Sequence, residues 1–188
     1  MTRFFVALLT PPAVTDFAME VIGQLGDRHQ THTAKAPPHI TLQAPFEWKI
    51  QDIQRVEAGL AQFAQAHSPI PIQLSGFGSF PPHVLYIQVL KTSGLMNLQS
   101  DLPQTLDPEL GIVDPKIRQR GFTPHVTVAS RNLTRQTFGL VWEALQGFEQ
   151  IEVEFWSDRL TLLQHDGQQW QIRREFSFDQ SQQNLIGD

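Results

Sequence analysis

Residues 37–46 read PPHITLQAPF, and residues 123–131 read TPHVTVASR. Both stretches contain the pattern Pro-His-(apolar β-branched)-Thr-(apolar), in which polar and apolar side chains alternate. Alternation with a period of two is typical of a β-strand that buries one face. The pattern therefore predicts two strands, each with a histidine and a threonine on one face and an apolar face that anchors it in a hydrophobic core.

The surrounding sequence predicts strands and helices in an order that repeats around the two motifs. We expect strands at residues 4–10, 39–44, 70–80, 83–90, 125–130, 151–155, 159–164 and 170–178. We expect helices at residues 14–30, 53–64, 93–106 and 135–145, with Asp52 as a candidate N-cap. The repeated order indicates an internal duplication within an α+β fold. We expect a single domain of two lobes over residues 1–178, with one motif in each lobe, and a polar tail over residues 179–188.

Composition limits the classes of function. The chain has 188 residues, a net charge of −5 and no cysteine. The acidic balance argues against binding to duplex DNA, and the lack of cysteine excludes disulfides, thiolate catalysis and cysteine-bound metals. The apolar run at residues 4–9 is too short for a signal peptide and is followed by two prolines. With no run long enough to span a membrane, we expect a cytoplasmic monomer that does not enter the membrane.

The motif residues suit acid-base chemistry at a phosphate. On a strand, His39 and Thr41 lie roughly 6.5–7 Å apart on one face, close enough to contact one phosphate-sized group, and His125 and Thr127 repeat this arrangement. If two such strands face each other across a cleft, one neutral histidine takes a proton from water. The other histidine, protonated, gives a proton to the departing ribose oxygen. The threonine hydroxyls hold the non-bridging oxygens, and no metal is needed. The sequence leaves open which histidine is the base.

With these two motifs the chain resembles the two-histidine (2H) phosphoesterase superfamily, also called the 2′-5′ RNA ligase-like family. The N-terminal stretch FFVALLTPP and the strand order fit as well, so the resemblance spans nearly the whole chain. It implies a bilobal α+β fold of two antiparallel β-sheets that form a central cleft, with helices packed outside. It also implies a metal-independent cyclic phosphodiesterase without a cofactor, acting on RNA ends or nucleotide cyclic phosphates, with reversible RNA ligation in some members. The catalytic residues that it carries over are His39, Thr41, His125 and Thr127.

Six further residues are candidates for substrate binding. Because alternate residues of a strand share one face, Gln43 is expected on the face of His39 and Thr41. By the same alternation Arg131, just past the second motif strand, is expected on the face of His125. Guanidinium groups suit phosphate, and aromatic rings stack on bases. The remaining candidates on these grounds are Arg120, Tyr86, Phe46 and Phe122.

Other readings of the sequence are weaker. His29-Gln30-Thr31 is a third H-x-T triplet, but it lacks the preceding proline and the apolar alternation. His29 and His32 have no carboxylate or cysteine at ligand spacing, so we expect no metal site. Two alternatives to the phosphodiesterase remain open. One is a protein that binds nucleotides or RNA ends without catalysis, and the other is a phosphodiesterase for a non-RNA cyclic phosphate metabolite.

Overall fold

The strands and helices of the protein follow the order expected from its sequence. The computed structural model describes residues 1–113 and 121–181. Within them the strands are β1 (Thr2–Leu9), β2 (His39–Trp48), β3 (Ile70–Phe80), β4 (Val84–Val89), β5 (His125–Ala129), β6 (Glu152–Ser157), β7 (Arg159–His165) and β8 (Trp170–Ser177). The helices are α1 (Pro12–His29), α2 (Ile53–Gln65), α3 (Ser93–Leu110) and α5 (Phe138–Gln146), and the 3₁₀ turn η1 (Ile50–Asp52) precedes α2.

The strands form one curled antiparallel sheet in the order β6-β3-β4-β5-β2-β1-β7-β8. It consists of two four-stranded halves, β6-β3-β4-β5 and β2-β1-β7-β8, which are joined where Ile40 pairs with Val126. These halves are the two antiparallel sheets that the resemblance implied, and the α+β class is confirmed. Each half contains one motif strand but draws strands from both halves of the chain. Strand β4 of the hairpin β3-β4 pairs with β5, whereas β7 pairs with β1 and β8 pairs with β7.

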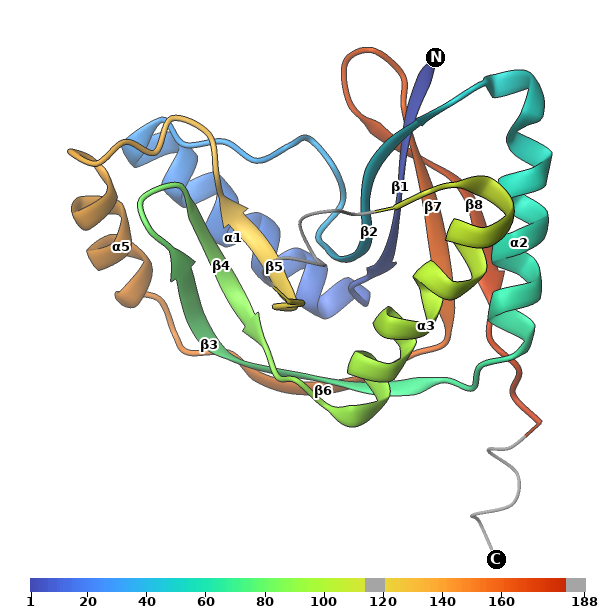
Figure 1. The fold of residues 1–188 in the computed structure, drawn as a ribbon. Coiled ribbons are helices and arrows are strands. Elements are labelled where there is room, and N and C mark those ends of the chain that lie inside the picture. Colours follow the sequence, from blue (N-terminus) through green and yellow to red (C-terminus); the bar gives the residue numbers. More distant parts are fainter. Residues whose placement is uncertain (114–120, 182–188) are drawn as a thin grey trace, which may run out of the picture.

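The helices pack outside this sheet (Figure 1). Helix α1 contacts β5 and α5, while α2 contacts α3, β7 and β8. Helix α1 buries the side chains of Val14, Ala18, Val21 and Leu25, which recur every three or four residues and therefore share one face. Among the described residues, no helix has the length and apolar character needed to cross a bilayer.

The largest differences from the predicted helix boundaries lie at the end of α3 and at the start of α5. Helix α3 continues to Leu110 through Pro108, and it ends where Gly111 adopts a left-handed conformation with φ of 64°. Helix α5 begins at Phe138 rather than at residue 135. Asp52 is the last residue of η1 and occupies the N-cap position of α2. Its side chain makes no capping hydrogen bond, contrary to the role expected for it.

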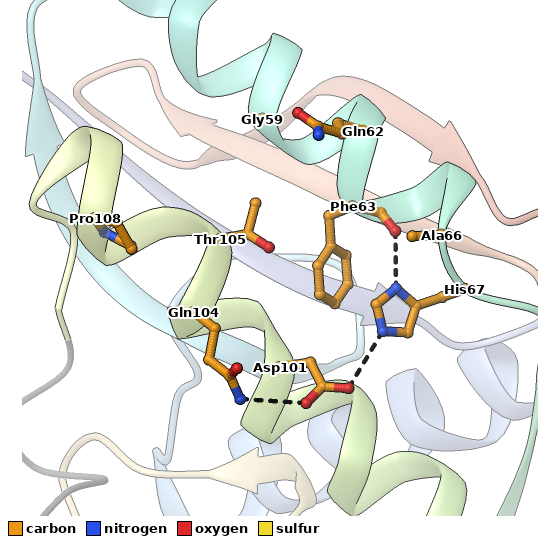
Figure 2. Close-up of a pocket in the computed structure, with 9 residues that line it drawn as sticks. All are labelled: Gly59, Gln62, Phe63, Ala66, His67, Asp101, Gln104, Thr105 and Pro108. Atoms are coloured by element: carbon orange, nitrogen blue, oxygen red, sulfur yellow. Dashed lines mark hydrogen bonds and ion pairs between the residues drawn. The ribbon is translucent and has the colours of Figure 1, made fainter.

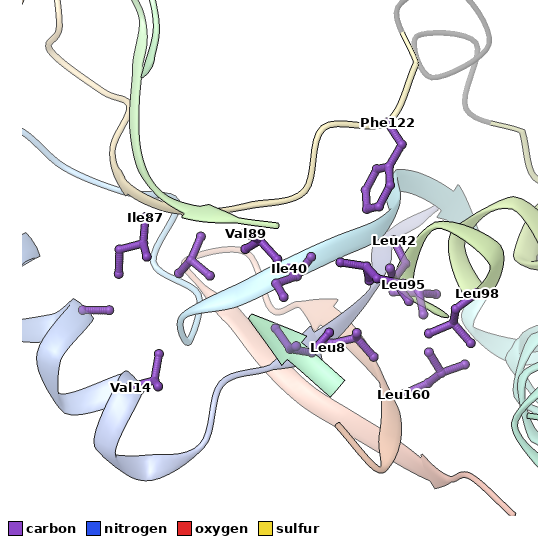
Figure 3. Close-up of a cluster of buried hydrophobic side chains, with 14 of the residues drawn as sticks. Leu8, Val14, Ile40, Leu42, Ile87, Val89, Leu95, Leu98, Phe122 and Leu160 are labelled. Atoms are coloured by element: carbon purple, nitrogen blue, oxygen red, sulfur yellow. The ribbon is translucent and has the colours of Figure 1, made fainter. Parts of the chain in front are cut away.

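A single large hydrophobic core fills the space between the helices and one face of the sheet. Figure 3 shows part of this core, with Leu42 of β2 beside Leu95 and Leu98 of α3 at one end, and Ile87 of β4 on the side of Val14 of α1. The motif residues that alternate with the histidines and threonines are all buried here, with exposed fractions of 0–1% for Ile40, Leu42, Val126 and Val128. Burial of each such side chain contributes about 1.5–3 kcal/mol. The core therefore fixes which face of β2 and β5 the polar motif residues occupy.

Candidate active site

The two motifs meet at the junction of the two sheet halves. Strands β2 and β5 are antiparallel, and Ile40 pairs with Val126. Because residue numbers run in opposite directions on antiparallel strands, this register sets His39 opposite Thr127 and Thr41 opposite His125. His39 and Thr127 also line one pocket of about 100 Å³ together with Ser130. The structure thus brings the four motif residues to one face at adjoining positions, each partly exposed.

Both motif histidines are held by the same backbone contact. The Nδ1 atom of His39 lies 2.6 Å from the carbonyl oxygen of Pro37, and the Nδ1 atom of His125 lies 2.8 Å from that of Thr123. A carbonyl oxygen only accepts hydrogen bonds, so Nδ1 carries the proton in both rings and donates it. Each accepting residue precedes a proline, whose fixed φ limits the path of the backbone toward the histidine. The Nε2 atom of each ring is therefore left to accept or donate a proton elsewhere.

The surroundings lower the proton affinity of both rings. Burial lowers the pKa of His39 below its ordinary value, and the charge of His125 lowers it further, although the hydrogen bond to Pro37 opposes the change. Burial likewise lowers the pKa of His125, against the hydrogen bond to Thr123. The electrostatic effect of one ring on the other means that protonation of either disfavours protonation of its partner. The pair is suited to carry a single proton.

Aromatic side chains from β3 and β4 surround His125. The ring of Tyr86 lies 5.2 Å from that of His125, and the edge of Phe80 approaches at 5.1 Å. Tyr86 pairs with Thr127 in the β4–β5 register and thus lies beside the second motif, but it is 8% exposed and offers little surface to a base. Phe80 was not predicted. Gly78 was also missed: a Cβ atom there would lie 2.3 Å from Tyr86 Cε2, so this glycine makes room for the tyrosine ring.

A second pocket lies on the other side of His39. It has a volume of about 170 Å³, and Thr41, Phe5 and Trp170 line it together with His39. The rings of Phe5 and His39 lie 4.8 Å apart, and Trp170 meets Phe5 edge-on at 4.6 Å. Neither Phe5 nor Trp170 was predicted to lie beside the first motif. Trp170 follows the turn at residues 166–169, and only the pairing of β7 with β1 brings it near the first motif.

Gln43 does not line these pockets, although strand alternation predicted it on the same face as His39 and Thr41. Its side chain is 1% exposed, and its amide nitrogen donates to the carbonyl oxygen of Ala44 at 3.2 Å. The cause is an irregularity in the β1–β2 register, where Val6 pairs with Gln43 but Ala7 pairs with Thr41. The extra residue in β2 breaks the alternation, so that Leu42 and Gln43 are both buried.

Two of the predicted stacking residues contact the core. Phe122 is 8% exposed and lies in the main hydrophobic cluster (Figure 3). Phe46 packs against the same cluster, with its ring 6.1 Å from that of Phe4. The burial of Phe122 contradicts the prediction that it stacks on a ligand, whereas Phe46 is only partly buried, and its stacking role stays a prediction.

Of the two arginines predicted to bind phosphate, the structure describes Arg131. Arg131 is exposed and directly follows the end of β5, where its backbone forms a bridge with His32, with N–O distances of 2.9 and 3.3 Å. It lies one residue beyond Ser130, which lines the smaller pocket. Arg120 lies outside the described residues.

A larger pocket, of about 440 Å³, lies between α2 and α3 and contains none of the motif residues (Figure 2). His67 and Asp101 line it and already contact each other, with 3.5 Å between His67 Nε2 and an Asp101 carboxylate oxygen. The Nδ1 atom of His67 donates to the carbonyl oxygen of Phe63 at 2.8 Å. Since its ionisable groups satisfy each other, size alone does not make this pocket the site. Among the described residues, no group of three or more His, Cys, Asp or Glu side chains is placed to bind a metal ion.

Known proteins match this chain over most of its length. The sequence profile of the 2′-5′ RNA ligase superfamily matches residues 11–169. A Geobacillus kaustophilus protein, provisionally named a phosphoesterase, is 28% identical over 180 residues, covering 93% of this chain and 95% of its own.

Solved structures share the fold. A Thermus thermophilus protein superposes with a TM-score of 0.70 at 19% identity, over 95% of this chain and 99% of its own. Escherichia coli LigT, crystallised with NADP⁺ and with 3′-AMP, superposes with TM-scores of 0.61 and 0.62 at 16% and 15% identity. Those superpositions cover 95% of this chain and 98–99% of LigT.

Proposed function

The chain belongs to the 2′-5′ RNA ligase superfamily of two-histidine phosphoesterases, and we propose that it hydrolyses 2′,3′-cyclic phosphate or 2′-5′ phosphodiester bonds in RNA or nucleotides. The observation that carries the proposal is the matched pair of histidines. Each has its Nδ1 proton committed to a backbone carbonyl, and each lies opposite the threonine of the other motif in the β2–β5 register. This leaves two Nε2 atoms and two hydroxyl groups for one phosphate.

The reaction that we propose needs one proton on the histidine pair. The neutral ring accepts a proton from water through Nε2 as the water oxygen attacks phosphorus. The protonated ring donates its Nε2 proton to the ribose oxygen as the phosphorus–oxygen bond breaks. Thr41 and Thr127 donate hydrogen bonds to the non-bridging oxygens, where negative charge increases in the transition state. The anionic substrate favours the protonated form of one histidine, which offsets the effect of burial on its pKa.

A nucleotide substrate has further support. LigT, which shares this fold, has been crystallised with 3′-AMP, ATP and NADP⁺. Phe80, which is 37% exposed and lies 5.1 Å from the ring of His125, offers a ring on which a base can stack. Reversal of the hydrolysis would give RNA ligation at the same residues.

The test is turnover of 2′,3′-cyclic AMP, of 2′-5′-linked ApA and of an oligonucleotide ending in a cyclic phosphate, all in EDTA. We expect His39→Ala and His125→Ala each to lower kcat by roughly 10²–10⁴-fold while the fold remains intact. Replacement of the exposed His83 by alanine is the matched control and should leave kcat unchanged. Unchanged turnover in either motif variant would exclude that histidine from the chemistry. Binding of these substrates without turnover by the wild type would favour a non-catalytic role.

A further inference from the structure

A β-bulge follows the threonine of the second motif. Tyr86 of β4 pairs with Thr127, but the preceding residue of β4 pairs with Ala129, so one residue of β5, Val128, is inserted between the two pairs. Val128 and Ala129 are consecutive and both are fully buried, whereas strict alternation would bury only one of them. The bulge thus shifts the alternation by one residue, and Ser130 returns to the face that carries Thr127.

The first motif has the same bulge. One residue of β2 is inserted next to Thr41 in the β1–β2 register. The burial of the side chains at residues 39–44 follows the same order as at residues 125–130, namely half-buried, buried, half-buried, buried, buried and half-buried. The bulge therefore brings a third residue of each motif to the face of the histidine and the threonine. This third residue is Ala44 in one lobe and Ser130 in the other, so the second lobe alone carries a hydroxyl group at this position.

Ser130 lies where a phosphate held by both motifs comes within its reach. It lines the pocket of about 100 Å³ together with His39 of the first motif and Thr127 of the second. That volume holds about three water molecules at ~30 Å³ each, so a group that enters the pocket lies close to all three side chains. Among the described residues, no Asp or Glu side chain lines this pocket, and no carboxylate there repels an anion.

The hydroxyl group of Ser130 is available to a ligand. The backbone N–H of Ser130 donates to the carbonyl oxygen of His32 at 3.0 Å, which holds the residue at the end of β5. Within residues 1–113 and 121–181, the side chain of Ser130 forms no hydrogen bond, and neither does that of Thr127. Polar groups that a fold shields from water normally have a partner. A half-buried, unpaired hydroxyl beside two motif residues is therefore placed to donate to a bound group.

We propose that Ser130 donates a hydrogen bond to the non-bridging oxygen of the substrate phosphate that Thr127 also contacts. The inference rests on the proposed function, because it assigns Ser130 to the phosphate of that reaction. One non-bridging oxygen then has two hydroxyl donors, whereas the other, next to Thr41 and Ala44, has one. Since negative charge increases on these oxygens in the transition state, the additional donor raises kcat. The site thereby distinguishes two oxygens that a symmetric pair of motifs would treat alike.

The experiment uses the two diastereomers of adenosine 2′,3′-cyclic phosphorothioate, in which sulfur replaces one or the other non-bridging oxygen. Sulfur is a weak hydrogen-bond acceptor, so loss of a donor costs little when sulfur occupies the position that this donor contacts. We expect Ser130→Ala to lower kcat on 2′,3′-cyclic AMP by roughly 10²-fold, but by less than about 10-fold on one of the two diastereomers. Thr127→Val should spare the same diastereomer, and Thr41→Val should spare the other. Ser100→Ala, at an exposed position of α3, is the matched control and should leave all three rates unchanged.

The outcomes separate this inference from the proposed function. If Ser130→Ala slows all three substrates equally, or slows none of them, Ser130 does not contact a non-bridging oxygen, and the inference is overturned while the phosphodiesterase stands. It is overturned as well if Ser130→Ala spares the diastereomer that Thr41→Val spares.

A wild type that turns over none of these substrates would defeat the proposed function, and binding would then decide the role of Ser130. Calorimetric titrations with 3′-AMP and with adenosine compare a ligand that carries a phosphate with one that lacks it. Weaker binding of 3′-AMP, but not of adenosine, by Ser130→Ala supports the hydrogen bond to phosphate. Equal affinity of Ser130→Ala and the wild type for 3′-AMP overturns it.

Discussion

Ile40 of β2 pairs with Val126 of β5, and within the described residues no other register pair joins the two halves of the sheet. Both side chains are buried in the main core, at 1% and 0% exposure. A slip of one residue in either strand would move these side chains to the opposite face. The same two residues that join the lobes therefore hold His39 opposite Thr127 and Thr41 opposite His125.

The threonine hydroxyls give a first prediction. Thr41→Val and Thr127→Val keep the shape of the side chain but remove the donor to the non-bridging oxygens. We expect each to lower kcat by roughly 10²–10³-fold, as loss of one transition-state donor does, with little change in KM. Steady-state kinetics on 2′,3′-cyclic AMP measures both parameters. A rise in KM at constant kcat would show instead that the hydroxyl only binds the ground state.

The pKa shifts of the two histidines predict an acidic optimum for kcat/KM. The active free enzyme carries one proton on the pair, and burial lowers the pKa of both His39 and His125 below about 6.5. Above that value both rings are neutral and the acid is missing; at low pH both are protonated and the base is missing. The bell-shaped pH profile of kcat/KM should therefore peak below about pH 6.5. The pH profile of kcat should peak at higher pH, because the bound anionic substrate raises the pKa of the histidine that acts as the acid. Rates measured from about pH 4.5 to 9 test this, and a kcat/KM optimum above about pH 7.5 would contradict it.

The same shifts predict how stability depends on pH. Unfolding returns both histidines to an ordinary pKa near about 6.5, so the unfolded chain binds more protons than the folded chain just below that pH. The free energy of unfolding must then fall as pH drops from about 6.5 toward the lowered pKa values of the folded state. Urea titrations at about pH 7.5 and 5.5 should show a smaller loss for His39→Gln than for the wild type. His83→Gln, at an exposed position, serves as the control and should behave as the wild type does.

Gly78 offers a test of how the tyrosine is positioned. An added Cβ would lie 2.3 Å from Tyr86 Cε2, so Gly78→Ala must displace the ring that contacts His125. We expect a loss of about 1–3 kcal/mol in stability from overpacking and a lower kcat. In a Tyr86→Ala background the Gly78→Ala change should cost little, which a double-mutant cycle detects. Gly23→Ala, with no atom within 4 Å of the new Cβ, is the matched control.

The local elements and the strand positions of the two histidine-threonine motifs could be predicted from the sequence because their signals are local. Alternation over five residues is enough to place His39 and Thr41 on one face of a strand. The prediction for Gln43 failed two residues later, since a β-bulge depends on the partner strand β1 and leaves no mark in the motif itself.

Residues that reach the site from distant strands could not be found in this way. Trp170 lies at the site only because β7 and β8 pair beside β1, and Phe80 and Gly78 only because the hairpin β3-β4 pairs with β5. Phe122 was misassigned for a related reason. An aromatic side chain near a motif has the same sequence signature whether it faces the core or the ligand, and packing decides between the two.

The ion pairs of Glu57 give the last prediction. Its carboxylate lies on α2, 8% exposed, and accepts hydrogen bonds from Arg173 Nε at 2.6 Å and from the Arg174 guanidinium at 2.9 Å. These contacts dock α2 on β8. Burial alone would raise the pKa of Glu57, but the two arginines outweigh it and lower the pKa. The folded state is therefore stabilised above the ordinary pKa of a glutamate, and this contribution is lost as pH falls through the lowered value.

Glu57→Gln keeps the shape and removes the charge. Because both arginines keep part of their hydration, at 28% and 56% side-chain exposure, we expect a loss of about 1–3 kcal/mol at pH 7 rather than the full cost of a broken buried pair. The difference from the wild type should stay constant between about pH 5.5 and 8 and shrink as pH falls below about 4, because the unfolded wild-type chain then gains a proton that the folded chain does not bind. Urea unfolding across this range measures it, with Glu143→Gln at an exposed position as the control. A difference that persists undiminished at about pH 3 would mean that the amide disturbs packing, and that charge is not what holds α2 to β8.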